Sequence, residues 1–436
     1  MSMRWDERAT ALLEGVTSPV TGIVRRIVAL PSTGSRLPFH HVQVHPARYS
    51  ALSCSGDIAQ SGGSDLSLET CIIKAAFEAI ERYCGSFMDY SRTLYAPPTS
   101  DFLQAGINYQ RFADFQYEPE DWPFYRRQED RPIHWVMGRS LVSGKRRGVP
   151  ATLVPVPSVP PTPFDTLGPT FSTGFACGWD WESACRSGLL EVVERDAFAI
   201  AWAHRVRHSA LAPVPGTRLE ALAQTCRDAG VQGLHFVDVR TDVGIPVVAC
   251  TLIHEAAGHR YPAVGLSAHP VQAVACLKAL SEAVSEYERL RLVLESGTQR
   301  WRYRGSFHHV RDFPDHGELF LNEELQDELD FLTDDRDAVA VEGDLDDRDG
   351  ASLLDLVERV SDFCGEIIAL ELTTRDVAPL GVRVVKIVVP KMVPLHAHHR
   401  FPYLGHDRLW TVGGRDPEGI DNQDPSRLNA VPHPFS

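Results

Sequence analysis

The chain has 436 residues and a formal net charge of −15, and its sequence contains no block of basic residues. This balance excludes a protein that binds the backbone of a nucleic acid, because such binding needs clustered lysine and arginine. No apolar run approaches the ~18–20 residues of a membrane span, and the first residues, M-S-M-R-W-D-E-R, lack the apolar core of a signal peptide. We therefore expect a cytoplasmic protein with no membrane partner.

Nine cysteines are present, and no two of them form a C-x-x-C pair. An odd number without ligand spacing is typical neither of a disulfide framework nor of a structural zinc site. We expect these cysteines to be small buried side chains.

In chain order, the first pattern is an alternation of apolar and polar residues within 17–50, which predicts short strands. Helical apolar spacing then occurs in three segments, 66–84, 180–205 and 270–294. Seven prolines between the first two helices make 149–170 a loop or an extended segment.

Two short apolar runs, Val247–Leu252 and Val382–Val389, predict buried strands. An acidic stretch, 331–349, is typical of a solvated loop. Pro432 and Pro434 keep the last residues extended.

These elements predict an α+β fold, and a chain of this length can form one large domain or two ordinary ones. Its predicted parts are N-terminal strands (1–60), a core with the three helices (61–330), the acidic loop (331–349) and a C-terminal part with the proline-rich tail (350–436).

The three predicted helices share a motif that indicates a diverged internal repeat. The first two helices each carry E-x-x-E-R, with a small residue one turn earlier. The matched residues are Ala75, Glu78, Glu81 and Arg82 in the first helix, and Gly188, Glu191, Glu194 and Arg195 in the second. The third helix keeps Ala279 and Glu282, but Ser285 replaces the second glutamate.

The repeated glutamates need a chemical reason. Residues at i, i+3 and i+4 share one helix face, and two carboxylates on that face repel each other. Apolar neighbours make their burial costly unless a cation compensates the charge. Mg²⁺ prefers carboxylate and phosphate oxygens, and arginine binds phosphate. The residues therefore predict a magnesium and phosphate site between repeated helices, without a Walker-type or G-x-G-x-x-G loop.

The sequence resembles the YcaO family in three segments, 61–83, 172–197 and 263–283. Its C-terminal part, with L-T-T-R-D-V-A-P-L-G-V-R-V-V-K-I-V-V-P (372–390), F-P-Y-L-G-H-D-R-L (401–409) and the final P-H-P-F, is similar to the subgroup that forms azoline rings in ribosomal peptides. The resemblance implies a single YcaO-type domain over residues 1–436, in which repeated helix-on-sheet units enclose an ATP and Mg²⁺ site.

The resemblance also implies an ATP- and Mg²⁺-dependent cyclodehydratase. A Cys, Ser or Thr side chain of the substrate peptide attacks the preceding amide carbonyl. ATP then phosphorylates the resulting oxygen, and phosphate leaves to give a thiazoline or oxazoline. Catalysis of this kind depends mainly on positioning and charge neutralisation.

Carried over by position, the family's roles fall on two sets of residues. The implied Mg²⁺ ligands are Glu78, Glu81, Glu191 and Glu194. The implied ATP contacts are Arg82, Arg195, Glu282 and Arg289. The terminal carboxylate, here that of Ser436, is implied to assist proton transfer, with Pro432 and Pro434 holding it in place.

The sequence departs from the family at three points. The tail ends in Ser436 where a proline is usual, and Ala75 stands where a serine is common. The third segment has Glu282-Ala283-Val284-Ser285-Glu286-Tyr287 in place of E-A-x-Q-x-R, which displaces the arginine to Arg289 or Arg291.

Two alternatives remain open from the sequence: a YcaO enzyme that makes a thioamide or amidine, and a non-catalytic subunit that presents a peptide. The expected partners are a ribosomal precursor peptide and a separate leader-binding protein. The sequence leaves the oligomeric state, a homodimer included, undecided.

Overall fold

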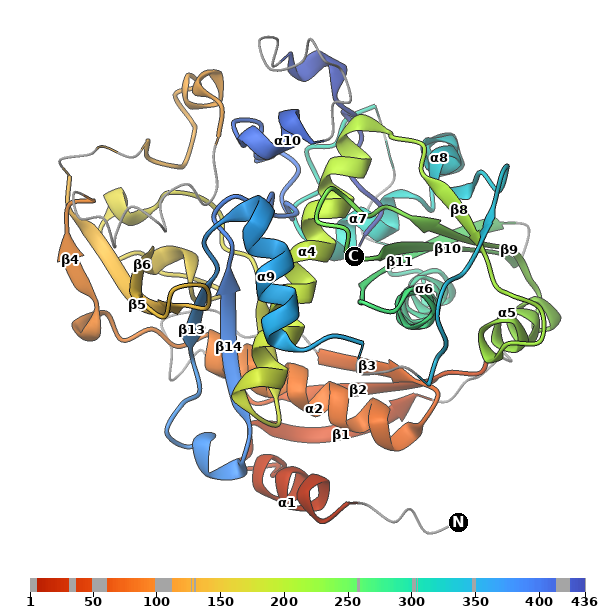
Figure 1. Cartoon of the computed structure of the whole chain (residues 1–436), viewed down its shortest axis with the longest axis horizontal. Helices are drawn as coiled ribbons and strands as arrows, with labels where there is room; N and C mark the ends of the chain where they lie inside the picture. Colours follow the sequence, from red (N-terminus) through yellow and green to blue (C-terminus); the bar gives the residue numbers. More distant parts are fainter. Residues whose placement is uncertain are drawn as a thin grey trace. The chain divides into compact units, whose positions relative to one another are not determined.

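The structure is a computed structural model that describes residues 6–30, 37–48, 61–98, 112–126, 128, 131–256, 259–299, 303, 305–346, 350–412 and 424–435. Two compact units make up the chain (Figure 1): residues 1–31, 40–192 and 352–392 form the first, and residues 32–39, 193–351 and 393–436 form the second. The single domain predicted from the sequence stays a prediction. Helices and strands occur in both units, as expected for an α+β protein.

A three-stranded antiparallel sheet opens the first unit, in the order β1 (Val24–Leu30), β2 (His40–Pro46) and β3 (Ser61–Asp65). Helix α2 (Leu68–Gly85) packs on β2 and β3, and α1 (Glu7–Val16) contacts α2. The Ser67 side chain accepts a hydrogen bond from the Thr70 N–H and so caps α2. Both the strands and the helix predicted in this region are confirmed.

The second sheet of this unit has the order β4-β5-β13-β14-β7, with β6 paired to β5, and every pairing is antiparallel. Its strands are β4 (Leu94–Ala96), β5 (Ile133–Ser140), β6 (Arg146–Pro150), β7 (Phe175–Gly178), β13 (Ile368–Glu371) and β14 (Arg383–Val388). Strand β14 is buried from Val384 to Val388 and ends before Pro390, as predicted. Helix α9 (Leu353–Cys364) also belongs to this unit.

The proline-rich segment 149–170 contains the end of β6 and two short 3-10 helices, Ala151–Leu153 and Pro163–Asp165, and is otherwise irregular. This agrees with the predicted loop. Further 3-10 helices lie at Tyr90–Arg92, Asp114–Tyr117, Glu323–Leu329, Ala378–Leu380 and Pro425–Arg427.

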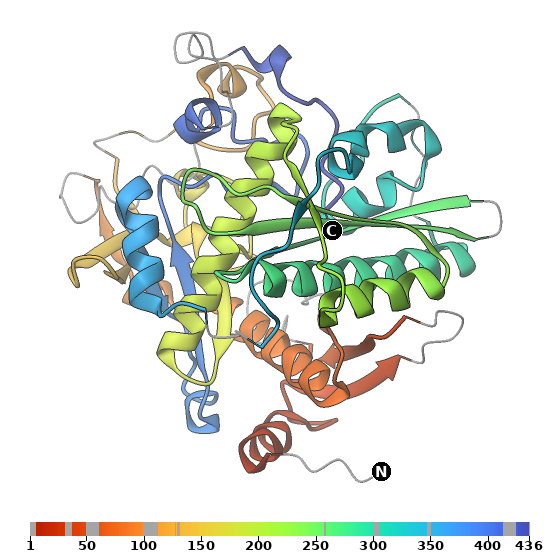
Figure 2. The ribbon, with the colours of Figure 1, turned by 45° about the vertical axis from the view of Figure 1, so that its right-hand side comes forward.

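The sheet of the second unit has the order β11-β10-β9-β8-β12. Its strands are β8 (Ser209–Ala212), β9 (Val231–Asp238), β10 (Val247–Ala256), β11 (His259–Ala268) and β12 (Val339–Ala340). Helix α6 (Gln272–Glu295) packs along β10 and β11, and α5 (Arg218–Asp228) contacts β9 and α6, so the two helices lie side by side on one face of the sheet (Figure 2). The predicted strand Val247–Leu252 is the first part of β10.

The acidic stretch 331–349 is mostly exposed where it is described, but it is not entirely a loop. It includes the end of α8 (Asp330–Thr333) and the short strand β12, which pairs in parallel with β8 through Val339 and Leu211. The pairing of only two residues at a sheet edge leaves almost no hydrophobic pattern to detect. Helices α7 (Phe313–Leu319) and α10 (Asp407–Thr411) complete this unit.

Helix α4 (Trp181–His204) carries the second E-x-x-E-R motif, and the boundary between the units falls inside it, after Val192. Eight cysteines lie among the described residues; all are free thiols, seven of them buried, as expected, while Cys54 lies outside the described part. None of the described helices combines the length and the apolarity that a membrane crossing requires.

Candidate ATP and magnesium site

Each of the three repeated helices holds one glutamate against the strand region that precedes it. Glu78 accepts a hydrogen bond from the Gly62 N–H (2.9 Å), Glu191 from the Gly174 N–H (3.1 Å), and Glu282 from the Leu266 N–H (3.2 Å). The same contact therefore recurs on α2, α4 and α6, which confirms the internal repeat predicted from the sequence.

Small residues let the helix and strand backbones approach closely enough for this hydrogen bond to form. A Cβ on Gly63 would lie 2.4 Å from the Cys71 carbonyl oxygen and 3.0 Å from the Ala75 nitrogen, and a Cβ on Gly188 would lie 2.6 Å from the Gly174 carbonyl oxygen. In the third repeat, a Cβ on Gly265 would lie 2.2 Å from the Ala279 carbonyl oxygen. Because helix and strand backbones touch, a glutamate one turn further along the helix reaches a strand N–H.

In the first unit, α2 gathers Glu78, Glu81 and Arg82. The Arg82 guanidinium lies 3.6 Å from Glu78 and 3.4 Å from Glu81, whose side chain is 15% exposed. The pKa of Glu81 is raised to about 8, mainly by burial; the nearby carboxylates of Glu191 and Glu78 contribute to the increase, and Arg82 opposes it. An acid that is costly to ionise in the free protein is the kind of group that a divalent cation stabilises.

Lys386 joins this cluster and was missed by the sequence reasoning. It lies on β14, is 0% exposed, and donates to the carbonyl oxygens of Phe171 (2.8 Å) and Val154 (3.4 Å). Burial lowers its pKa to about 7, although Glu191 and Glu81 oppose the shift. The available signal was a lysine in the middle of V-R-V-V-K-I-V-V, a segment that was expected to form a strand.

In the second unit, α4 continues with Glu194 and Arg195. Glu194 is 8% exposed and accepts a hydrogen bond from the Ala268 N–H at the end of β11 (3.1 Å). Burial raises the pKa of Glu194 to about 7, with Arg195 lowering it and Glu282 raising it. The Arg195 Nε lies 3.4 Å from Glu194, and the guanidinium stacks 4.0 Å from the centroid of the Phe435 ring.

Asp196, the residue after Arg195, is bound to other residues of the second unit. Its carboxylate accepts hydrogen bonds from the Arg408 Nε (2.9 Å) and from the Val393 N–H (2.8 Å), and it is 0% exposed. Helix geometry turns adjacent residues about 100° apart, so Asp196 faces away from the side that Arg195 occupies. Asp196 thus stabilises the segment that follows β14.

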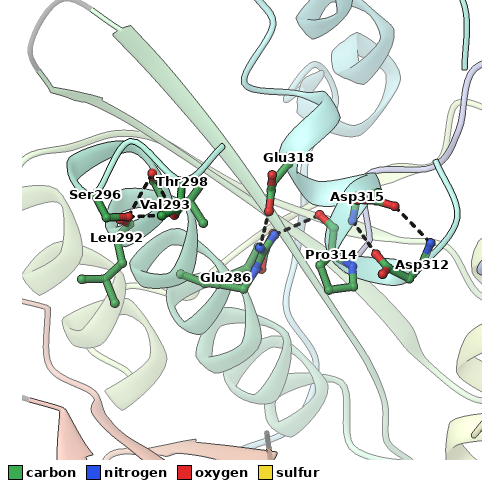
Figure 3. Close-up of polar contacts among 10 residues, drawn as sticks. Glu286, Leu292, Val293, Ser296, Thr298, Asp312, Pro314, Asp315 and Glu318 are labelled. Carbon is green, nitrogen blue, oxygen red and sulfur yellow. Dashed lines mark hydrogen bonds and ion pairs between the residues drawn. The ribbon is translucent and has the colours of Figure 1, made fainter. Parts of the chain in front are cut away.

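The arginines of the third helix are bound to acids of their own unit, and Figure 3 shows Glu286, Pro314 and Glu318, the partners of one of them. Arg289 donates to both carboxylate oxygens of Glu286 (2.7 Å each), to Glu318 (3.3 Å) and to the Pro314 carbonyl oxygen (3.3 Å). Pro314 and Glu318 lie on α7, whose start is capped reciprocally by Asp312 and Asp315. Arg291 is held in the same way by its own helix, through Glu288 and Glu295. A phosphate contact by Arg289 would require these pairs to open.

The terminal segment runs back along α4. The Asn429 N–H donates to the Ala203 carbonyl oxygen (2.7 Å), the Trp202 Nε1 donates to the Val431 carbonyl oxygen (2.8 Å), and the Phe435 ring meets Arg195. Pro432 and Pro434 are buried within this stretch, which has bends at Val431 and Pro434 and forms neither helix nor strand; its extended conformation stays a prediction. The next residue, Ser436, lies outside the described residues.

Comparison with known proteins identifies the family. The profile described as "YcaO cyclodehydratase, ATP- and Mg²⁺-binding" matches residues 62–393. The chain belongs to the YcaO family.

Solved YcaO and heterocyclase structures share the fold. One titled "Heterocyclase in complex with substrate and Cofactor" superposes with a TM-score of 0.77 at 23% identity, covering 99% of this chain and 58% of that one. A YcaO protein from Methanopyrus kandleri "bound with AMPPCP and Mg2+" gives 0.60 at 22% identity, covering 88% and 89%. The E. coli "Microcin synthetase McbBCD complex with pro-MccB17 bound" gives 0.66 at 15% identity, covering 96% and 99%.

A curated relative, an uncharacterised protein in the tfuA 3' region of Rhizobium leguminosarum bv. trifolii, is 30% identical over 167 residues. The match covers 35% of this chain and 38% of that protein. This YcaO chain therefore spans well under two thirds of that relative, and 58% of the heterocyclase above.

The side chains described above are of the types that bind magnesium and a nucleoside triphosphate in this YcaO chain. Among the described residues, no three His, Cys, Asp or Glu side chains converge closely enough to hold a metal ion by themselves. Mg²⁺ does not require such a cage, because it commonly takes one or two carboxylates and completes its shell with water and phosphate oxygens. In the first unit Arg82 lies beside Glu81, and in the second unit Arg195 lies beside Glu194, so each pair offers a carboxylate of the kind that binds Mg²⁺ and a guanidinium of the kind that binds phosphate.

Proposed function

We propose that this protein is an ATP-dependent cyclodehydratase that forms thiazoline or oxazoline rings on a ribosomally made precursor peptide. The observation that carries the proposal is the repeated glutamate held by a strand N–H on α2, α4 and α6. It fixes carboxylates in place before any ligand binds, which is what a phosphoryl-transfer site needs. Membership of the YcaO family supports the same reading.

In this proposal Glu78, Glu81, Glu191 and Glu194 hold Mg²⁺, and Arg82 and Arg195 bind the phosphates of ATP. Glu282 extends the acidic set on α6. Arg289 is the weakest member, since Glu286 and Glu318 already neutralise its charge. The nucleotide supplies a phosphoryl group that converts the amide oxygen into a leaving group.

The proposed reaction closes the ring and transfers one phosphoryl group. The side-chain sulfur or oxygen of Cys, Ser or Thr attacks the preceding carbonyl carbon and loses its proton, and the carbonyl oxygen takes the γ-phosphoryl group. Loss of the amide N–H proton and of phosphate then forms the C=N bond of the azoline, with ADP as the second product. Protein groups contribute by positioning the peptide and stabilising the phosphate charge.

The tail is proposed to serve the proton transfers of this reaction. Its course along α4 brings Phe435 onto Arg195, and the buried Pro432 and Pro434 limit its freedom. Ser436, the next residue, carries the proposed proton-accepting carboxylate. A precursor peptide and a leader-binding protein are the proposed partners, by analogy with the peptide-bound microcin synthetase complex.

The test is to incubate the protein with ATP, Mg²⁺, a Cys/Ser/Thr-rich candidate precursor and its leader-binding partner, and to weigh the peptide. Loss of one water mass for each modified residue, with stoichiometric release of ADP and phosphate, is the expected result. In a parallel incubation that also contains sulfide as the sulfur donor, replacement of oxygen by sulfur without ring closure would instead assign the chain to thioamide formation. No ATP turnover under any condition would leave only the peptide-presenting role.

The same assay tests the tail. A chain that lacks Ser436 is expected to bind ATP normally and to form rings more slowly, because the phosphate-binding residues are untouched. An unchanged rate of ring formation would remove the proposed role of this carboxylate.

A further inference from the structure

A cavity of about 240 Å³ lies in the second unit, against the last two turns of α4. One wall is formed by Ala199, Trp202 and Ala203 of that helix. The segment after β14 forms another wall, from Val393 to Leu404, and the terminal segment closes it through Val431 and His433. The wall is mostly apolar, with the aromatic rings of Trp202 and Tyr403 among its members.

The cavity is close to Arg195, the residue of the second unit that is proposed to bind phosphate. Arg195 and Ala199 are one helical turn apart on the same face of α4, which corresponds to roughly 6 Å along the axis. The terminal segment connects the two places as well, since His433 lines the cavity and Phe435 stacks on Arg195. A peptide residue in this cavity would therefore lie beside the proposed reaction centre.

Several polar atoms around the cavity have no partner among the described residues. They are the His396 Nε2, the His399 Nδ1, the Asn429 Nδ2 and the Nδ1 of His433, which is 0% exposed. Two of these groups use their other polar atom: the Asn429 Oδ1 accepts from the Val431 N–H (3.0 Å), and the His433 Nε2 lies 2.9 Å from the His396 carbonyl oxygen. Buried polar atoms without partners are unfavourable, so the wall is better matched to a ligand with a polar tip than to a hydrocarbon.

Size limits the ligand further. An apolar cavity of ~150 Å³ holds a benzene molecule, whereas sites for drug-sized ligands measure ~300–1,000 Å³. The cavity lies between these values, which suits a single aromatic ring with one or two attached groups. Aromatic walls favour such a ring through edge-to-face and offset contacts.

We propose that this cavity is a specificity pocket that binds a hydroxyl-bearing aromatic side chain, a tyrosine, of the substrate peptide. The peptide part of this inference rests on the proposed cyclodehydratase function. The ring packs between Trp202 and Tyr403, and the hydroxyl meets the unpartnered nitrogens of His396, His399 or Asn429. Binding of this residue places the neighbouring Cys, Ser or Thr next to Arg195.

The pocket is tested first without ATP, Mg²⁺ or peptide. The probes are p-cresol and toluene, which correspond to the side chains of tyrosine and phenylalanine, and binding to the full chain is followed by ligand-observed NMR. Saturable binding of p-cresol, tighter than that of toluene, is expected. No saturable binding, or equal affinity for the two probes, overturns the proposal.

A pair of variants locates the binding. Ala199→Leu fills the cavity from α4, whereas Ala221→Leu makes the same change at an exposed position of α5. Binding of p-cresol should be lost in the first variant and kept in the second, with both variants melting as single folded species. Retention of binding in folded Ala199→Leu places the probe elsewhere and refutes the pocket.

The peptide assignment has its own readout. In the ring-forming assay p-cresol should compete with the peptide and leave the KM for ATP unchanged. Binding of the probe without such competition would keep the aromatic site but remove its role in peptide recognition. If ring formation itself is never observed while p-cresol binds wild type and not Ala199→Leu, the proposed function fails and the pocket stands.

Discussion

At the scale of single residues, the molecule carries acids that it can bury only with help. Glu78 and Glu191 are partly buried, and each uses one oxygen to accept a backbone N–H at or next to a strand, which offsets part of the cost of desolvation; Glu282 makes the same contact at an exposed position. Glu81 and Glu194 have raised pKa values because burial disfavours their charged forms. A divalent cation would reverse that penalty, since it stabilises the ionised carboxylates.

Glu191→Gln tests this balance. Glutamine keeps an oxygen that can accept the Gly174 N–H, so the fold should persist, but the negative charge is gone. Affinity for Mg²⁺-ATP is expected to fall at least about tenfold, which corresponds to ~1.4 kcal/mol of binding free energy. Isothermal titration calorimetry measures the affinity, and circular dichroism confirms the fold.

Glu182→Gln is the matched control, because Glu182 is an exposed residue in the first turn of the same helix. Its binding of Mg²⁺-ATP should equal that of wild type. Normal binding by Glu191→Gln would refute the assignment of Glu191 as a ligand.

At the scale of elements, the recurring unit is a helix that touches the backbone of the preceding strand. In the repeat that contains α4, a Cβ on Gly188 would lie only 2.6 Å from the Gly174 carbonyl oxygen. The same carbonyl oxygen accepts a hydrogen bond from the Ile387 N–H of β14 (2.7 Å). The position of Glu191 therefore depends on the absence of a side chain one turn earlier. Small residues in this motif are a packing requirement rather than a general preference for helix formation.

Gly188→Ala should show this dependence. The added methyl group would force helix and strand apart, and we expect a loss of about 1–3 kcal/mol in the free energy of unfolding, as for other overpacked cores. Urea denaturation measures the change. Ser187→Ala, one residue earlier at an exposed position, is the control and should have little effect. A Gly188→Ala protein as stable as wild type would mean that the two backbones can move apart without any loss in the free energy of unfolding.

At the scale of the whole molecule, a group of histidines makes the protein sensitive to acid. His316 is 0% exposed, and its ring nitrogens lie 2.9 Å from the His433 carbonyl oxygen and 2.7 Å from that of Ala397. Burial lowers the pKa of His316 and of His399 to about 4. The pKa values of His396 and His433 are also lowered by burial.

These histidines are neutral in the folded chain and become charged near pH 6.5 in the unfolded chain. The unfolded state therefore binds more protons between about pH 6.5 and pH 4, so the free energy of unfolding should fall as the pH drops through this window. Urea denaturation at a series of pH values measures the slope, which should exceed that of a single histidine. A His316→Gln variant should show a shallower slope than wild type; an identical slope would contradict this account.

The sequence by itself determined the strands and helices with strong periodicity, the internal repeat and the acids that the repeat carries. Helix α2 was predictable because it buries one face with helical spacing, whereas α4 and α6 are buried on most sides and were predictable because their apolar segments are too long for a strand. The strand before Pro390 was predictable from its short apolar run. The two-residue strand β12 was not, since an edge pairing so short has no pattern of its own. The family resemblance added the reaction, which no periodicity contains.

Tertiary structure alone decided how the charges are used. Asp196 binds Arg408, more than two hundred residues later in the chain, and Arg289 is neutralised by Glu286 and by Glu318 of α7. Lys386 looked like one charge in an apolar strand, yet it is enclosed with two backbone carbonyls as its acceptors. Such pairings depend on which segments, far apart in the sequence, the fold brings within a few ångströms of each other. A local sequence pattern does not predict these contacts. The cavity beside α4 could not be predicted from the sequence for the same reason, because its walls come from three separate stretches of chain.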